Sequence, residues 1–91
     1  MLTVKVLRSK TAKAIINRAY EADKNASISS DGLAVRGYTI NAIAKRVDDG
    51  WDISLDSSVF GLQTLMSLVN DVYEAIKAQR ALATTGQKGL N

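Results

Sequence analysis

The sequence predicts an α+β fold, an antiparallel sheet of three to four strands with two helices on one face, in the order strand, helix, three strands, helix. Three observations support this prediction. Apolar and polar residues alternate at the start of the chain, apolar residues recur at helical intervals in two longer segments, and a turn motif joins two further alternating segments. The length of 91 residues allows one domain, which we expect to span residues 1–83.

The first strand is predicted at residues 2–6, because the apolar side chains at the even positions would share one face. The first helix is predicted from Thr11 to about Asn25, and Ser9 is placed to cap it. Charged and amide side chains occupy one side of this helix, a pattern typical of a helix that covers a sheet with its other side. The apolar side comprises Ala12, Ile15, Ile16, Ala19, Ala22 and Ala26.

Residues 47–51, Val-Asp-Asp-Gly-Trp, predict a hairpin with a three-residue loop and its glycine in the left-handed conformation. In that register Val47 faces Trp51. Turn residues at 29–32 separate this hairpin and a short strand at 33–35 from the first helix. The apolar face of the hairpin then comprises Ile43, Val47, Trp51, Ile53 and Leu55.

Residues 39–47 also fit a helix, because alanines and basic residues in this segment favour one. A helix here would open a helix-turn-helix whose second helix would lie in residues 51–56. Those residues alternate as a strand, so the hairpin is the preferred interpretation and the helix is the alternative.

The last helix is predicted from Val59 to about Ala83, with residues 56–58 as caps and residues 84–91 as a flexible tail. Its apolar surface is wider than the stripe that one sheet face can cover. We therefore expect part of it to mediate self-association, as a homodimer, or to dock a partner. The competing interpretation is that the first helix packs beside it and covers the second flank. The residues expected to take part in self-association are Phe60, Met66 and Tyr73.

The sequence contains no histidine and no cysteine. The commonest general base, metal ligand and neutral-pH nucleophile are therefore missing, so we expect no catalytic residues, no metal site and no cofactor. A carboxylate cluster near the hairpin matches no calcium-loop spacing, and its members are interpreted as turn formers and a cap. This cluster comprises Asp48, Asp49, Asp52 and Asp56. There is no apolar run of 18 residues and no signal-peptide pattern in residues 1–9, so a cytoplasmic protein without membrane contact is expected.

Half of the twelve Lys and Arg residues lie in residues 1–26, together with only two of the nine acidic residues. Lys10 and Lys13 fall in the first turn of the predicted helix, where the helix dipole disfavours cations and favours a bound anion. Arg8 precedes them and Arg18 follows. We predict that these four residues bind an anionic partner, either nucleic-acid phosphate or an acidic protein surface. The competing interpretation is a solvated charged face.

A protein that lacks catalytic groups but has a basic helix and surplus apolar surface is expected to work by binding. The strand, turn and strand around residues 47–51, leading into a helix from Ser58, resemble in layout the small phage-encoded anti-CRISPR proteins. This resemblance implies an inhibitor that docks on a ribonucleoprotein effector complex and blocks capture of target DNA, in the host cytoplasm if the protein is phage-encoded. Arg8, Lys10, Lys13 and Arg18 would then face phosphate or an acidic groove.

The alternative function is RNA binding. A helix, three strands and a helix, preceded by a strand, are also similar to the double-stranded RNA-binding domain and to ribosome hibernation factors. Those families open the last helix with Lys-Lys-x-Ala-Lys, whereas residues 59–62 here are Val-Phe-Gly-Leu. The binding protein is therefore the preferred interpretation.

Overall fold

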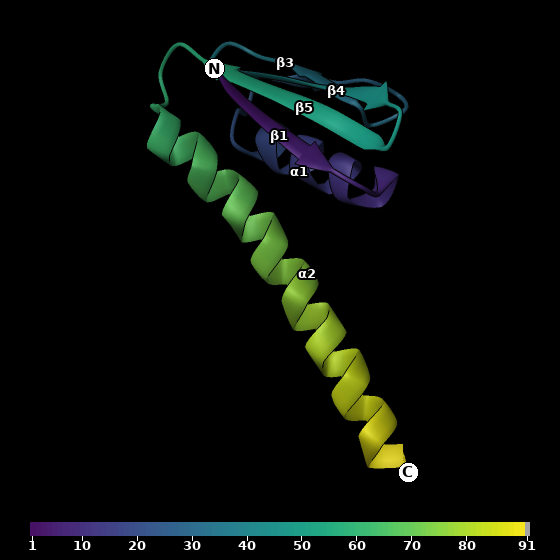
Figure 1. Ribbon diagram of the computed structural model, residues 1–91. Helices are drawn as coiled ribbons and strands as arrows, with labels where there is room; N and C mark the ends of the chain where they lie inside the picture. Colours follow the sequence, from purple (N-terminus) through teal and green to yellow (C-terminus); the bar gives the residue numbers. More distant parts are fainter. Residues whose placement is uncertain (91) are drawn as a thin grey trace.

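The computed structural model describes the backbone of residues 1–90 and the side chains of residues 1–80. Five strands form one antiparallel sheet in the order β1-β5-β4-β3-β2 (Figure 1). The predicted α+β fold is confirmed, with five strands instead of three to four. The elements are β1 (Leu2–Val6), α1 (Ser9–Glu21), β2 (Ser27–Ile28), β3 (Ala34–Arg36), β4 (Ile40–Val47), β5 (Gly50–Ser57) and α2 (Leu62–Leu90).

The first strand, β1, lies at one border of the sheet and pairs only with β5, from Leu2 opposite Leu55 to Val6 opposite Trp51. Its even positions face the helices, as the alternation predicts: Val6 is buried, and Leu2 is half-buried. The opposite border is β2, which has two residues. The longer free strand edge of the sheet is therefore that of β1.

Helix α1 buries its predicted apolar side, including Ala12, Ile15 and Ile16, against the sheet. The expected capping role of Ser9 is wrong, because Ser9 is the first helical residue and Arg8 occupies the N-cap without a side-chain hydrogen bond. The helix also ends at Glu21, before the predicted end near Asn25.

The Asp23 carboxylate closes the turn that follows α1. It accepts the backbone N–H of Thr39 at 2.7 Å and that of Asn25 at 2.9 Å. These hydrogen bonds lower the pKa of Asp23 below its ordinary value of 3.8, because they stabilise the charged carboxylate. The turn also brings the carboxylate close to Gly37, where a β-carbon would clash with it. Asp23 thus links the end of α1 to the loop between β3 and β4.

The hairpin of β4 and β5 has a two-residue Asp48-Asp49 loop, with Val47 opposite Gly50. The strand prediction for this segment is confirmed over the helical alternative, but the predicted register, with Val47 facing Trp51, is wrong by one residue. The shift puts Ile43, which is 44% exposed, on the outer face of the sheet. The residues of β4 that face the core are Ile40, Ala42 and Ala44.

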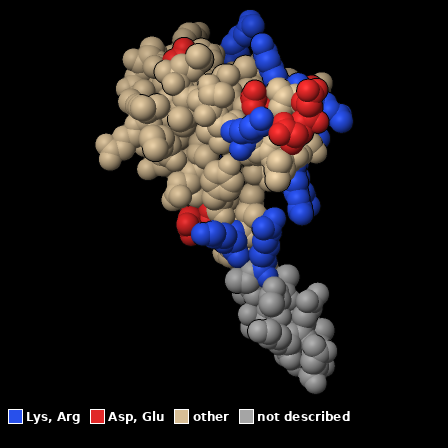
Figure 2. All heavy atoms as spheres, in the orientation of Figure 1, with Lys and Arg blue, Asp and Glu red and all other residues tan. Residues whose placement is uncertain are grey.

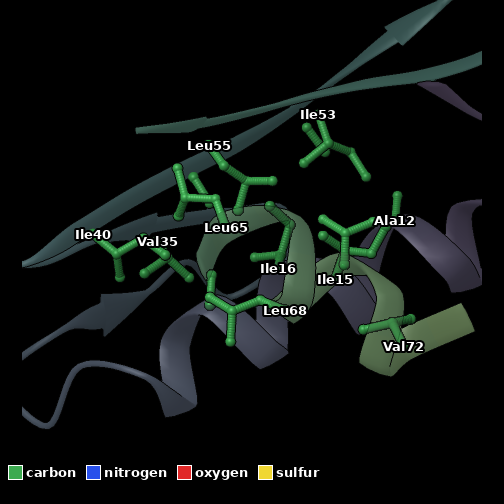
Figure 3. Close-up of a cluster of buried hydrophobic side chains, with 14 of the residues drawn as sticks. Ala12, Ile15, Ile16, Val35, Ile40, Ile53, Leu55, Leu65, Leu68 and Val72 are labelled. Atoms are coloured by element: carbon green, nitrogen blue, oxygen red, sulfur yellow. The ribbon is translucent and has the colours of Figure 1, made fainter. Parts of the chain in front are cut away.

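Both helices pack on the same face of the sheet, where their apolar side chains meet those of the strands in one core (Figure 3). From the sheet, Ile53 and Leu55 are completely buried, and Ile16 of α1 packs in the same cluster. Helix α2 contributes Leu65, Leu68, Val69 and Val72.

Helix α2 begins at Leu62, three residues after the predicted start, because a turn precedes it. The Ser57 hydroxyl accepts the N–H groups of Val59 at 3.1 Å and Phe60 at 2.7 Å, and it donates to the Thr39 carbonyl. Ser57 therefore fixes the path from β5 into the helix.

The helix continues to Leu90, beyond the predicted end near Ala83. Asn91 lies outside the described residues, and the flexibility expected for residues 84–91 stays a prediction. With 29 residues the helix is about 43 Å long, which exceeds the length of the eight-residue strands, so it leaves the sheet along its course (Figure 1). Among the described residues, no helix combines the length and apolar character needed to cross a bilayer.

Candidate partner-binding groove

The two helices diverge and leave a groove of about 690 Å³ between them. Its two walls are the exposed flank of α1 and the second half of the described part of α2. The floor is apolar and is formed by Ala14, Val72, Ala75 and Ile76. The charged residues around it are Arg8, Lys10, Arg18, Glu21, Asp71 and Arg80. Four cations and two acids thus surround an apolar floor.

Three of the four predicted anion-binding residues, Arg8, Lys10 and Arg18, line this groove. Lys13 does not line it and lies on the other flank of α1, where its Cγ approaches Gly32. There the Ser29 hydroxyl lowers the pKa of Asp31 by hydrogen bonding, and the nearby charge of Lys13 adds a smaller effect in the same direction. The predicted residues therefore do not form one patch, because α1 turns Lys13 away from the other three.

Arg18 is only partly available to a partner, since its Nη2 lies 3.5 Å from Asp71 Oδ2. Both side chains are at least one-third exposed, so this ion pair contributes below about 1 kcal/mol. Among the described residues, no carboxylate lies within ion-pair distance of Arg8, Lys10 or Arg80. These three cations are therefore the ones that a partner can neutralise.

The N-terminus of α1 strengthens the positive potential at this end of the groove. Arg8 offers no side-chain acceptor to the free N–H groups of the first turn, and the first turn contains no acidic residue. The positive end of the helix dipole thus adds to the charges of Arg8 and Lys10. Figure 2 shows Lys and Arg side chains gathered over the end of the sheet near this terminus and along α2, with acidic side chains beside them.

Arg80 was not among the residues that the sequence indicated. It follows Val72 and Ile76 at intervals of four residues, which places all three on neighbouring turns of one flank of α2. The spacing alone does not identify Arg80 as a groove residue, because the sequence does not show that this flank of α2 lies against α1. The packing of the two helices is what brings it to the groove.

The residues expected to mediate self-association separate in the structure. Phe60 is half-buried and packs against the core. Met66 is 55% exposed, Tyr73 is 38% exposed and Leu62 is 54% exposed. Met66 and Tyr73 do not line the groove but line a second, shallower depression. The first helix packs beside α2, as the competing interpretation expected, but it leaves these three residues exposed.

The carboxylates near the hairpin do not converge. Asp49 pairs with Lys5 at 3.3 Å, and Asp56 accepts the backbone N–H of Ser57. Within the described part of the chain, no group of three or more His, Cys, Asp or Glu side chains is arranged to hold a metal ion.

Comparison with known proteins gives no relative from which a role could be transferred: no family model, no curated protein and no solved structure matches this chain significantly. The function must therefore be argued from the groove itself.

Proposed function

We propose that the protein is a non-catalytic binding protein that inhibits a macromolecular complex by docking on it through the groove between α1 and α2. The observation that supports this proposal is the placement of three unpaired cations, Arg8, Lys10 and Arg80, around an apolar floor. A partner bound there would remove the apolar floor from water and would meet the cations with its own acidic groups. Buried apolar area and charge complementarity are two components of a specific protein interface.

The partner that fits this groove best is an acidic, partly apolar segment of a protein. Glu21 and Asp71 on the same groove would repel a continuous phosphate backbone, and Arg18 is already engaged with Asp71. Among the residues with described side chains, no aromatic residue lines the groove, so this part lacks the stacking surface on which unpaired bases are usually bound. An acidic segment can place its carboxylates at the cations and its apolar side chains on the floor.

The first candidate for the complex is a CRISPR effector, because the layout of the chain resembles that of anti-CRISPR proteins. Docking on the protein surface that receives target DNA would block DNA capture without any catalytic step. Because the channel that receives DNA is itself positively charged, the acidic segment that meets the cationic end of the groove would lie beside this channel. Attraction between the segment and the groove would be strongest at low ionic strength.

The proposal is tested by target-DNA capture in a gel-shift assay with a purified, guide-loaded effector complex. We expect the wild-type protein to reduce capture and the Arg8→Glu/Lys10→Glu variant to lose at least about tenfold in potency, since two charge contacts are reversed. The matched control is Lys24→Glu/Lys77→Glu, which makes the same charge change at exposed positions outside the groove. The control should retain the wild-type potency.

Two outcomes would contradict the proposal. If the wild-type protein had no effect on capture, the effector would be excluded as the partner. If both variants lost the same potency, the loss would come from the change in net charge and not from the groove. Tight binding of a free RNA duplex of about 16 base pairs, with a steep decrease as salt is added, would favour the RNA-binding alternative.

A further inference from the structure

The free edge of β1 adjoins an exposed apolar stripe of α2. The stripe consists of Leu62, Met66 and Tyr73, which are spaced by four and seven residues and therefore lie on one side of the helix. Leu2 of β1 lines a shallow depression of about 460 Å³ together with Met66 and Tyr73, so strand and stripe are contiguous. This surface is distinct from the groove between the helices, with which it shares no residue.

Within residues 1–80, no charged residue lines this depression, whose remaining residues are Gln63, Ser67, Val69 and Asn70. Figure 2 shows a broad area without blue or red atoms over the first turns of α2, with a small acidic group at the adjoining end of the sheet. Depletion of charge and enrichment in Met and Tyr distinguish the centre of protein interfaces from other surface. An uncharged surface beside an unpaired strand edge can bind a protein that itself has an uncharged surface beside a free strand edge.

The sequence of β1, Leu-Thr-Val-Lys-Val, is self-complementary in antiparallel pairing about Val4. In that register Leu2 lies opposite Val6 of a second copy on the helix side, and Thr3 lies opposite the second copy's Lys5 on the outer side. These pairs of opposite residues are the same whether the odd or the even residues of β1 direct their N–H groups toward the second copy. Lys5 would not face a second Lys5, and its charge is already matched by Asp49.

A register centred on Lys5 is less favourable, since two like charges would then lie directly opposite each other. The alternation of β1 thus selects one pairing in which apolar residues meet apolar residues and no cations are opposed. A different strand would match this edge only if it carried the same pattern. The second copy has that pattern by definition.

We propose that two copies of the chain associate about a two-fold axis at Val4, with β1 pairing with β1 and the stripes of the two α2 helices packing beneath it. The two sheets then form one sheet of ten strands, and both free edges of β1 are paired. A stable interface buries about 800 Å² on each partner, more than an edge of five residues provides alone, so the stripe must take part. The partner required is therefore this chain itself.

Cross-linking tests the register, because the chain contains no cysteine and any disulfide must come from introduced residues. Thr3→Cys and Lys5→Cys both lie on the exposed outer side of β1. When the two variants are mixed and oxidised, we expect a mixed disulfide dimer, since directly opposite residues have Cα atoms about 4.5–5.5 Å apart. Each variant alone should cross-link weakly, because like positions are offset by two residues along the strands.

Sedimentation velocity tests the role of the stripe. At about 100 μM we expect the wild-type protein to sediment as a dimer and the Met66→Lys/Tyr73→Lys variant as a monomer, with Kd raised at least tenfold. The matched control is Tyr38→Lys/Ile43→Lys, which replaces exposed apolar residues away from the stripe and should remain dimeric. Circular dichroism checks that all variants are folded.

A monomeric wild-type protein at this concentration would overturn the proposal. A dimer that survives the stripe variant would overturn the role of the α2 stripe in the interface, and efficient cross-linking of Thr3→Cys alone would overturn the two-fold pairing about Val4. Because the groove residues are unchanged in these variants, the results are independent of the proposed inhibitory function.

Discussion

Gly50 begins β5 at the point where β1 ends, and replacing it with alanine should strongly destabilise the fold. Its φ of +155° lies in a region that residues with a β-carbon rarely adopt. A β-carbon at this position would also overlap the carbonyl oxygen of Val6, in the neighbouring strand, and crowd Leu7. Alanine must therefore either strain the backbone or separate β1 from the hairpin.

The magnitude follows from these two effects. A strained backbone conformation costs about 1–3 kcal/mol, and forcing an extra carbon into a tight contact costs about 1–3 kcal/mol. Together they give a loss of about 2–6 kcal/mol in the free energy of unfolding, out of about 5–14 kcal/mol for a domain of this length. The melting temperature should fall by roughly 10–50 °C, since 1 kcal/mol corresponds to about 4–8 °C at this size.

Urea unfolding monitored by far-UV circular dichroism and by the fluorescence of the single tryptophan, Trp51, measures this loss. Gly61→Ala is the matched control, because a β-carbon at Gly61 meets no atom within 4 Å and its φ is not positive. We expect the control to stay within about 1 kcal/mol of the wild type. If Gly50→Ala were as stable as Gly61→Ala, the close approach of β1 to the hairpin would be wrong.

Four further results are expected. Leu55→Ala should lower the free energy of unfolding by about 2–5 kcal/mol in urea titrations, because this completely buried side chain leaves a cavity; a loss below about 1 kcal/mol would contradict its place in the core. Ser57→Ala should cost about 0.5–2 kcal/mol in the same assay, since two N–H groups lose their acceptor, whereas Ser67→Ala on the exposed side of α2 should change little. A double-mutant cycle of Arg18→Ala and Asp71→Ala should give a coupling below about 1 kcal/mol that decreases with added salt; a larger coupling would mean that the pair is better shielded from water than its exposure indicates. Because hydrogen bonds hold the pKa of Asp23 below 3.8, the unfolded chain binds its proton first as the pH falls; urea midpoints should be highest above about pH 5 and decline below about pH 4, and Asp23→Asn should be less stable at neutral pH and show a smaller decline.

Local patterns were sufficient to predict the class of fold and most of its elements. The alternation in residues 2–6 and the helical spacing of Ala12, Ile15 and Ile16 each correspond to a buried face in the structure. These elements could be predicted because each buries its apolar side against the same single core. Burial and periodicity therefore agree within each segment.

The hairpin register could not be predicted in the same way. The sequence pattern favoured the larger Ile43 and Val47 for the buried face, whereas the structure buries Ala42 and Ala44 of β4. Helix α1 packs closely over β4, and small side chains permit that approach. Which face of a strand is buried depended here on the helix above it, a long-range effect that no local pattern contains.

The candidate groove was only half visible in the sequence. The cations at the start of α1 could be identified from the sequence because the helix dipole disfavours cations there. That Lys13 lies on a different flank of α1 from Arg8 and Lys10 became clear only from the elements that pack against each flank. Arg80 lies about sixty to seventy residues along the chain from the α1 residues that form the other wall of the groove. Its inclusion depends on how α2 crosses α1, which is a property of tertiary packing.

The position of β1 in the topology has a consequence for the order of folding. The remaining strands pair with neighbours in sequence, but Leu2 must find Leu55, which closes a loop of about fifty residues at an entropic cost of about 3.5 kcal/mol. Non-local pairings of this kind slow folding, so the four-stranded meander and α1 should form before β1 docks. During synthesis, β1 thus leaves the ribosome before the other strands but is the last of them to join the native sheet.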